Sequence, residues 1–272
     1  MPVGPQGDPG DTLIRNWPLA SDTAGALSGL CPQWPAPVNV HAVSTLRSGG
    51  VSTGPYQGLN LGDHVGDVPG SVSENRRRLQ RALRLPSAPA WLSQVHGTTV
   101  VDAARPGSVA TGFPQADATM TTEVGIVCAV LTADCLPLVL CDRQGTRVAA
   151  VHAGWRGLAA GIIERTVEAL DVPALELLVW MGPAIGPTAF EVGTEVRERF
   201  TVHDPASQQA FQPGNQDRYL ADITLLARQR LQRLGIEAIY GGRWCTYSQP
   251  ESFYSYRRDG DTGRMATLIW MS

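Results

Sequence analysis

Short apolar runs alternate along this chain with segments that have the periodicity of helices. Most of the runs are continuous and rich in Val, Ile and Leu, which is typical of strands that are buried on both faces. We expect strands at residues 38–43, 99–103, 125–132, 136–141, 147–152, 175–181 and 266–271.

Three segments between these runs show helical spacing and helix-end signals. We expect helices at residues 71–83, 158–170 and 222–235. Ser71 and Glu74 have the spacing of a capping box at the start of the first. Asp222 is expected to be the N-cap of the last helix and Gly235 its C-terminal stop.

The interleaving of strands and helices indicates the fold class. With no Gly/Ser linker in the middle of the chain and no internal repeat, the pattern predicts one α/β domain with a mixed β-sheet and surrounding helices. Residues 1–35 mix Gly, Pro, Asp and Ser without periodicity, so we expect a mobile leader there. Residues 36–272 would then form a single catalytic domain.

Composition and charge exclude several classes of function. All 22 basic residues are Arg, which excludes Schiff-base, pyridoxal phosphate and P-loop mechanisms, because each needs a lysine. The net charge of −3 provides no basic field for nucleic acid. The five cysteines include no CxxC pair, and we see neither a signal peptide nor a membrane span. We therefore expect a cytoplasmic protein.

One cysteine and two histidines lie where chemistry is plausible. Cys135 falls in a break between two apolar runs, and His96 and His152 each follow an apolar segment just before Gly or Ala-Gly. Strand ends are where ligands usually bind in α/β proteins. One thiolate and two imidazoles suit Zn²⁺ with an open fourth position, but they equally suit a Cys–His dyad oriented by Asp134. A core cysteine with two hydrogen-bonded histidines is the third interpretation.

Two further segments suit small ligands. The segment LRSGGVSTGPYQGLNLG surrounds Arg47 with glycines, so its backbone N–H groups could form an anion-binding nest, although a plain surface loop fits as well. The segment CTYSQPESFYSYRRDG gathers aromatic side chains, among them Tyr247 and Tyr256, that could stack on a planar base or simply pack on the sheet.

Seven motifs in fixed order together resemble the YfiH family, also described as laccase-domain, polyphenol oxidase-like or peptidoglycan editing factor. The resemblance covers roughly residues 35–272. The motifs are GGVSTGPYQGLNLG, WLSQVHG, TADCLPLVLC, AAVHAGWRGL, GPAIGPTAFEVG, YLADI and SYRRDGDTGRMATLIWM. Around Arg47 the sequence STLRSGG departs from the Thr-Arg pairing usual in the family, which weakens a phosphate-binding role for this arginine.

The resemblance implies a zinc enzyme of the cytosol whose metal ligands are His96, Cys135 and His152. It also implies a fold similar to that of deamidating bacterial toxins with a Cys–His dyad, which keeps a cysteine-type hydrolase among the alternatives. Asp134 is a candidate general acid or base, or a residue that orients a ligand.

The activity that the resemblance implies is phosphorolysis of purine nucleosides, namely adenosine, inosine, guanosine and methylthioadenosine, together with adenosine deamination. The expected partners are therefore a purine nucleoside and phosphate. We expect substrate contacts from Arg47, Asn60 and His64, and a monomer or weak homo-oligomer.

Other descriptions of the family leave alternatives open. One is an amidase that edits peptidoglycan precursors, and a weaker one is a copper-dependent polyphenol oxidase. Multi-copper clusters need a histidine-rich set of ligands, whereas this chain has five histidines and no His-x-His pair, so copper is less favoured than zinc. A binding protein with a structural zinc is the non-enzymatic alternative.

Overall fold

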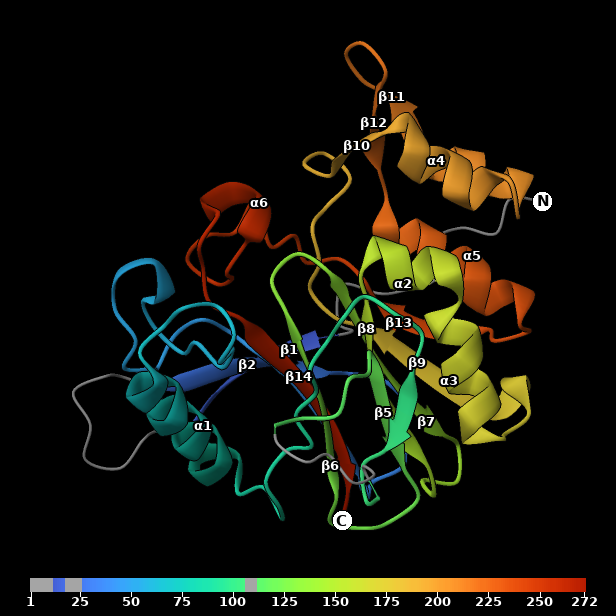
Figure 1. The fold of residues 1–272 in the computed structure, drawn as a ribbon. Coiled ribbons are helices and arrows are strands. Elements are labelled where there is room, and N and C mark those ends of the chain that lie inside the picture. Colours follow the sequence, from blue (N-terminus) through green and yellow to red (C-terminus); the bar gives the residue numbers. More distant parts are fainter. Residues whose placement is uncertain (1–11, 18–25, 106–111) are drawn as a thin grey trace.

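Two packed β-sheets form the centre of the computed structural model, which describes residues 12–17, 26–105 and 112–272 (Figure 1). The first sheet has five antiparallel strands in the order β1–β2–β3–β14–β6. Their bounds are β1 Thr12–Trp17, β2 Leu27–Pro32, β3 Val40–Thr45, β14 Met265–Met271 and β6 Val127–Thr132.

The second sheet has six strands in the order β13–β9–β7–β8–β5–β4. Their bounds are β13 Ala238–Gly241, β9 Leu177–Met181, β7 Leu136–Asp142, β8 Val148–Ala153, β5 Ala118–Thr121 and β4 Val100–Asp102. This sheet is mixed, because β13 runs parallel to β9 and β4 runs parallel to β5, while the other pairs are antiparallel.

Helices cover the outer face of each sheet (Figure 1). Helix α1 (Pro69–Leu83) lies on the side of the five-stranded sheet, and α2 (Trp155–Ala160), α3 (Ile162–Leu170) and α5 (Ile223–Arg233) lie on the side of the six-stranded sheet. A small third sheet, β10 (Glu191–Gly193), β12 (Arg218–Ala221) and β11 (Phe211–Pro213), carries α4 (Thr194–Thr201) at one edge of the molecule. A single turn, α6 (Tyr256–Asp259), precedes β14.

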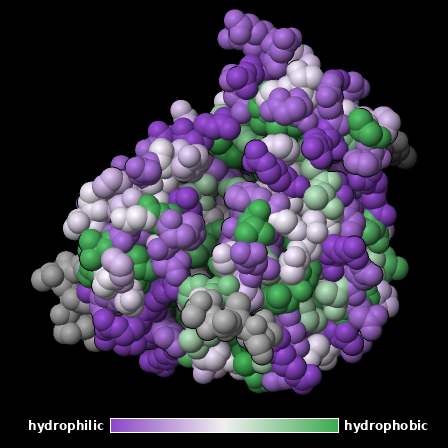
Figure 2. Space-filling view, viewed as in Figure 1, coloured by the Kyte–Doolittle hydropathy of each residue, from purple (hydrophilic) through white to green (hydrophobic). Residues whose placement is uncertain are grey.

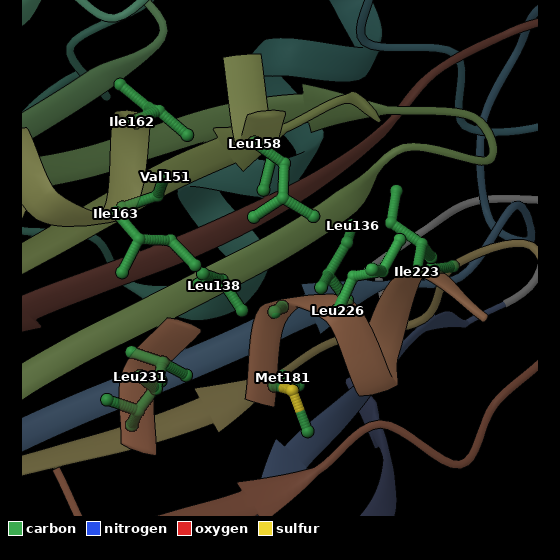
Figure 3. Close-up of a cluster of buried hydrophobic side chains, with 14 of the residues drawn as sticks. Leu136, Leu138, Val151, Leu158, Ile162, Ile163, Met181, Ile223, Leu226 and Leu231 are labelled. Atoms are coloured by element: carbon green, nitrogen blue, oxygen red, sulfur yellow. The ribbon is translucent and has the colours of Figure 1, made fainter. Parts of the chain in front are cut away.

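The central strands are apolar on both faces because each face meets a different layer. On β7, Leu136 and Leu138 belong to the core under the helices, whereas Val139 and Cys141 belong to the core between the two sheets. Figure 3 shows the first of these cores, in which Leu158, from α2, packs with other buried apolar side chains of the helices and strands. Alternate residues of one strand therefore fill two separate cores.

The α/β fold class and the single domain are confirmed. Every strand expected from an apolar run occurs, as β3, β4, β6, β7, β8, β9 and β14. These strands divide between two main sheets. Periodicity alone does not predict this division, because a strand that is buried on both faces has the same continuous apolar pattern in either sheet.

The helix predictions are confirmed in position but not at every boundary. Gly161, with φ +101°, divides the predicted second helix into α2 and α3. The capping box is wrong, because α1 already begins at Pro69 and Ser71 lies inside its first turn. Asp222 caps α5 as expected, and Gly235 follows its end with φ +83°. No helix among the described residues is long and apolar enough to cross a membrane.

Two strands lie within the described parts of the segment expected to be a leader. Strands β1 and β2 pair with each other, and β2 continues the sheet beside β3. Leu27 and Leu30 of β2 are fully buried. Residues 1–11 and 18–25 lie outside the described residues. Short strands that are flanked by Pro and Gly carry too little apolar periodicity to be recognised.

Candidate metal centre

His96, Cys135 and His152 meet at one end of the six-stranded sheet. One ligand atom from each lies within 4.8 Å of the others. Nε2 of His96 is 3.7 Å from Sγ of Cys135, and the two imidazole rings meet edge to face with centroids 4.8 Å apart. The structure thus brings together three side chains that are far apart in the sequence.

Strand pairing explains this meeting. Strands β7 and β8 are antiparallel, with Leu136 opposite Ala153, so the residue before β7 lies beside the end of β8. Cys135 is that residue, and His152 is the penultimate residue of β8. The start of β5 reaches the same edge, because Ala118 pairs with a residue near the end of β8.

The turn between β6 and β7 carries Cys135 from one sheet to the other, and Asp134 fixes this turn. Asp134 has φ +93°, a conformation that needs support in a residue other than glycine. Its carboxylate accepts the hydroxyl of Thr246 and the backbone N–H of Arg257, each at 2.6 Å, and its carbonyl accepts the N–H of Ile185 at 2.9 Å. These contacts favour an orienting role for Asp134 over proton transfer.

Asp117, which the sequence analysis missed, joins the two histidines. Its carboxylate lies 2.8 Å from Nδ1 of His152 and accepts backbone N–H groups from Val95, His96 and Gly97 at 2.6–3.3 Å. With Nδ1 of His152 occupied, Nε2 is left for a ligand. A lone aspartate before β5 gave no signal, because its role depends on pairing across strands.

Two glycines make room for the cluster. A Cβ at Gly154 would lie 2.5 Å from Cδ2 of His96 and 3.1 Å from Sγ of Cys135. A Cβ at Gly157 would lie 2.7 Å from the carbonyl oxygen of Gly97, so this glycine lets α2 approach the turn that carries His96. Close packing around the proposed ligands therefore requires glycine at both positions of the HAGWRG segment.

Charged neighbours in the cluster shift the pKa values of Cys135 and His152. Burial alone would raise the pKa of the Cys135 thiol, but the neighbouring imidazoles, chiefly that of His152, outweigh it and lower this pKa to about 6. Burial also opposes charge on His152, yet the Cys135 thiolate and the Asp117 carboxylate raise its pKa to about 9. By contrast, burial raises the pKa of the Cys128 thiol to about 12. The neighbouring imidazoles therefore favour the thiolate form of Cys135.

The donor set fits zinc. Tetrahedral Zn²⁺ with ligand distances of about 2.0–2.1 Å to nitrogen and about 2.3 Å to sulfur places such atoms about 3.6 Å apart. The separation of 3.7 Å between Nε2 of His96 and Sγ of Cys135 agrees with this value. Three protein ligands leave one coordination position open, as in catalytic zinc sites. In the described parts of the chain, no second cluster of His, Cys or carboxylate ligands accompanies this one.

The cluster lies in a cavity of about 480 Å³ whose lining combines apolar and positively charged residues. The apolar lining residues are Leu131, Trp155, Ile185, Phe190 and Ile223. His64 and three arginines, Arg156, Arg257 and Arg264, also line this cavity. Figure 2 shows hydrophilic residues over most of one face of the molecule, interrupted by hydrophobic ones. A ligand with an apolar body and an anionic group would match this lining.

Of the three residues expected to contact substrate, His64 lines this cavity. Burial and the charge of Arg264 lower the pKa of His64, which favours the neutral imidazole. Asn60 is fully buried, and its Oδ1 accepts the backbone N–H groups of Gly62 and Arg264 at 3.0 and 2.9 Å. Asn60 therefore shapes the backbone beneath Arg264 and is not among the lining residues.

Arg47 lines a different cavity, of about 830 Å³. Its guanidinium donates to the carbonyl of Pro250 at 2.9 Å and lies 4.6 Å from the centre of the Tyr254 ring. Phosphate binding by Arg47 stays a prediction, but it would take place apart from the cluster. Among the C-terminal aromatics, Tyr254 is fully buried and Tyr256 lines the cluster cavity, which Tyr247 does not.

Over most of its length the chain is similar to known proteins. The model of a family described as multi-copper polyphenol oxidoreductase laccase matches residues 41–272. A purine nucleoside phosphorylase of Pseudomonas aeruginosa is 55% identical over 243 residues, which make up 89% of this chain and 98% of the relative. The purine nucleoside phosphorylase YfiH of Escherichia coli is 54% identical over 247 residues, with the same coverage. The solved structure of Neisseria meningitidis protein NMB0706 is 49% identical, with a TM-score of 0.86, and the match covers 90% of this chain and 99% of that one.

Proposed function

Because the chain belongs to the YfiH family, we propose that it is a zinc-dependent purine nucleoside phosphorylase. The observation that carries the proposal is the His96–Cys135–His152 cluster in a cavity lined by both apolar side chains and arginines. The names of relatives that are 54–55% identical over 89% of the chain support it.

The residues of the cavity suit the two substrates of phosphorolysis. A zinc ion held by the cluster would supply a Lewis acid beside the ribose and phosphate. Asp117 holds Nδ1 of His152 and so aims Nε2 at the shared centre. The arginines balance the charge of phosphate, and the apolar lining residues, among them Trp155 and Phe190, shield the purine from water. An oxygen of hydrogen phosphate bonds to C1′ of the ribose as the bond from C1′ to the purine nitrogen breaks, and the proton that the phosphate gives up is taken by the leaving purine.

The proposal extends to adenosine, inosine, guanosine and methylthioadenosine as substrates, and to deamination of adenosine as a second activity. An apolar cavity wall holds these purines through their shared ring system and discriminates weakly between their substituents. Deamination replaces the amino group at C6 with an oxygen from water and needs no phosphate.

Purified protein incubated with adenosine tests the proposal. Adenine and ribose 1-phosphate should form only with phosphate present, and inosine should also form without it. Cys135→Ser should abolish both activities and remove about one zinc per chain, whereas Cys31→Ser, far from the cluster, should change neither. Full activity of zinc-free Cys135→Ser would exclude the proposal.

A cysteine-type hydrolase, such as an amidase acting on peptidoglycan precursors, is the second candidate. The low pKa of Cys135 and the hydrogen bond from His152 to Asp117 favour it, because nucleophilic cysteines need a thiolate and an oriented imidazole. Chelation of the protein followed by alkylation distinguishes the zinc enzyme from the cysteine hydrolase. Chelation should stop a zinc enzyme and leave a cysteine hydrolase active, and alkylation of the chelated protein should then stop the hydrolase.

Copper-dependent oxidation of phenols is the weakest candidate, although the matching family is described as a multi-copper oxidoreductase. Multi-copper sites need several histidine ligands for each cluster. Here one cluster with two histidines is found within the described ranges of the chain. The cytoplasmic location and the monomeric or weakly associated state stay predictions.

A further inference from the structure

The lining of the cluster cavity carries more positive than negative charge. Three guanidinium groups line it, those of Arg156, Arg257 and Arg264. The one lining carboxylate, that of Asp134, has both oxygens engaged, by the hydroxyl of Thr246 and the backbone of Arg257. The cavity is therefore built for an anion that the described residues do not themselves supply.

Arg264 is held through both its backbone and its guanidinium group. Its backbone is fixed by the side chain of Asn60 and by the N–H of Leu61. Its Nη1 donates to the carbonyls of Thr262 and Gly263 at 2.8 and 3.0 Å. In the described chain, neither Nε nor Nη2 has a hydrogen-bond acceptor, and no carboxylate pairs with this guanidinium. Nη1 is therefore held by the protein, whereas the edge formed by Nε and Nη2 is available to a ligand.

The position of Arg264 depends on a glycine. A Cβ at Gly62 would lie 2.7 Å from Cγ of Arg264, so only glycine leaves room for the arginine stem. Arg264 lines the same cavity as Cys135 and Asp134, so its charge acts on the space beside the cluster. An anion beside Cys135 would thus lie within the field of Arg264.

The other two arginines lie differently. Arg257 donates from Nη1 to the carbonyl of Glu191 at 2.9 Å and lies over the ring of Phe190. Arg156 is exposed and lies 4.4 Å from the centre of the Trp155 ring. Both guanidinium groups lie over aromatic rings that line the same cavity, so positive charge and aromatic surface adjoin each other there.

We infer that Arg264, together with the cluster, forms the phosphate subsite of this enzyme, and that the segment 256–264 supplies its positive charge in place of the Arg47 loop. This inference rests on the proposed function. A tetrahedral oxyanion with several oxygens can contact the free edge of Arg264 with one and face the cluster with another. Arg47 has no comparable free edge in the cluster cavity, because it lines the other cavity and donates to the carbonyls of Pro250 and Gln57.

Direct binding of inorganic phosphate tests the inference without any turnover. In ³¹P NMR titrations of the zinc-loaded protein, Arg264→Ala should weaken phosphate binding by about 10- to 100-fold, as expected for a lost charge-assisted hydrogen bond. Arg264→Lys should bind phosphate more tightly than Arg264→Ala, because lysine keeps the positive charge but lacks the planar guanidinium with its paired N–H donors. Arg243→Ala, an exposed arginine outside both cavities, is the matched control and should bind like the unaltered protein.

Kinetics give a second readout. Arg264→Ala should raise the KM for phosphate much more than that for adenosine, and phosphate-independent deamination and zinc content should stay close to those of the unaltered protein. Gly62→Ala, which displaces Arg264 without removing its charge, should act in the same direction. Arg47→Ala should leave phosphate binding unchanged if the inference is right.

The outcomes separate the subsite from the function. Unchanged phosphate binding in Arg264→Ala and Arg264→Lys, or a loss in Arg47→Ala instead, overturns the subsite even if phosphorolysis is real. Phosphate binding that depends on Arg264 in a protein without phosphorolysis supports the anion subsite and overturns the proposed function. An equal rise in both KM values would show that Arg264 only holds the fold of the cavity, which also overturns the inference.

Discussion

Asp117 holds His152 by a contact of 2.8 Å between Oδ1 and Nδ1, and the same carboxylate holds the backbone of the turn that carries His96. One fully buried side chain thus positions two of the three proposed ligands. The remaining ligand, Cys135, arrives separately on the turn between the sheets.

Asp117→Asn should weaken zinc binding by about 10- to 100-fold, as seen when a carboxylate behind a ligating histidine is lost. An amide keeps the shape but cannot accept from His152 and three backbone N–H groups at once, since only its oxygen accepts. Competition with a chromophoric chelator measures the change. Glu123→Gln, an exposed carboxylate paired with Arg105, is the control. Equal zinc affinities in both variants would contradict the role given to Asp117.

Gly154→Ala should reduce zinc content more than it reduces stability. The backbone at Gly154 has φ −65°, which alanine adopts freely, so the effect comes from the Cβ that would press on His96 and Cys135. Metal analysis and thermal melting measure the two effects. Gly70→Ala, in α1 with nothing within 4 Å of the added Cβ, should keep its zinc and gain up to about 1 kcal/mol. A fully zinc-loaded Gly154→Ala would argue against the tight packing described here.

In the metal-free protein, Cys135 should react with iodoacetamide in a way that follows its pKa of about 6. The thiolate is the reactive form, so the rate should fall about tenfold for each pH unit below 6 and level off above about pH 7. Mass spectrometry of the digested protein identifies the modified residue. Cys128, whose pKa burial raises to about 12, should stay unmodified over this range, and added zinc should protect Cys135. A rate that rises only above pH 8 would show that the imidazoles do not stabilise the thiolate.

Leu30→Ala should destabilise the protein by about 2–5 kcal/mol, because Leu30 is fully buried between the sheets. Leu13→Ala on the neighbouring strand should cost little, since Leu13 is 46% exposed. Denaturant unfolding compares the two. If Leu30 belonged to a mobile leader, as the sequence suggests, both variants would unfold like the unaltered protein.

The sequence predicts the interior of this fold better than its edges. The strands that hold the site, β6, β7 and β8, follow from apolar runs, and the three ligands follow from the resemblance to a family. Strand β5, only four residues long with two threonines, has no such run. Asp117 and Arg264 were missed because each acquires its role from partners on other elements, which one-dimensional spacing does not record. Arg47 was expected at the cluster because glycine loops suit anions, but β-sheet pairing carries that loop to another cavity.

The turn that bears Cys135 joins β6 of the five-stranded sheet to β7 of the six-stranded sheet, and His152 lies on β8 beside β7. A metal at the cluster would therefore hold the connection between the two sheets in place. Its affinity would then be thermodynamically linked to the free energy of unfolding. At a free zinc concentration 100 times its Kd, the linkage amounts to about 2.7 kcal/mol in favour of the native state. Substitutions in the core between the sheets would then change the affinity for zinc although they lie away from any substrate. Removal of zinc would in turn lower the fraction of folded protein.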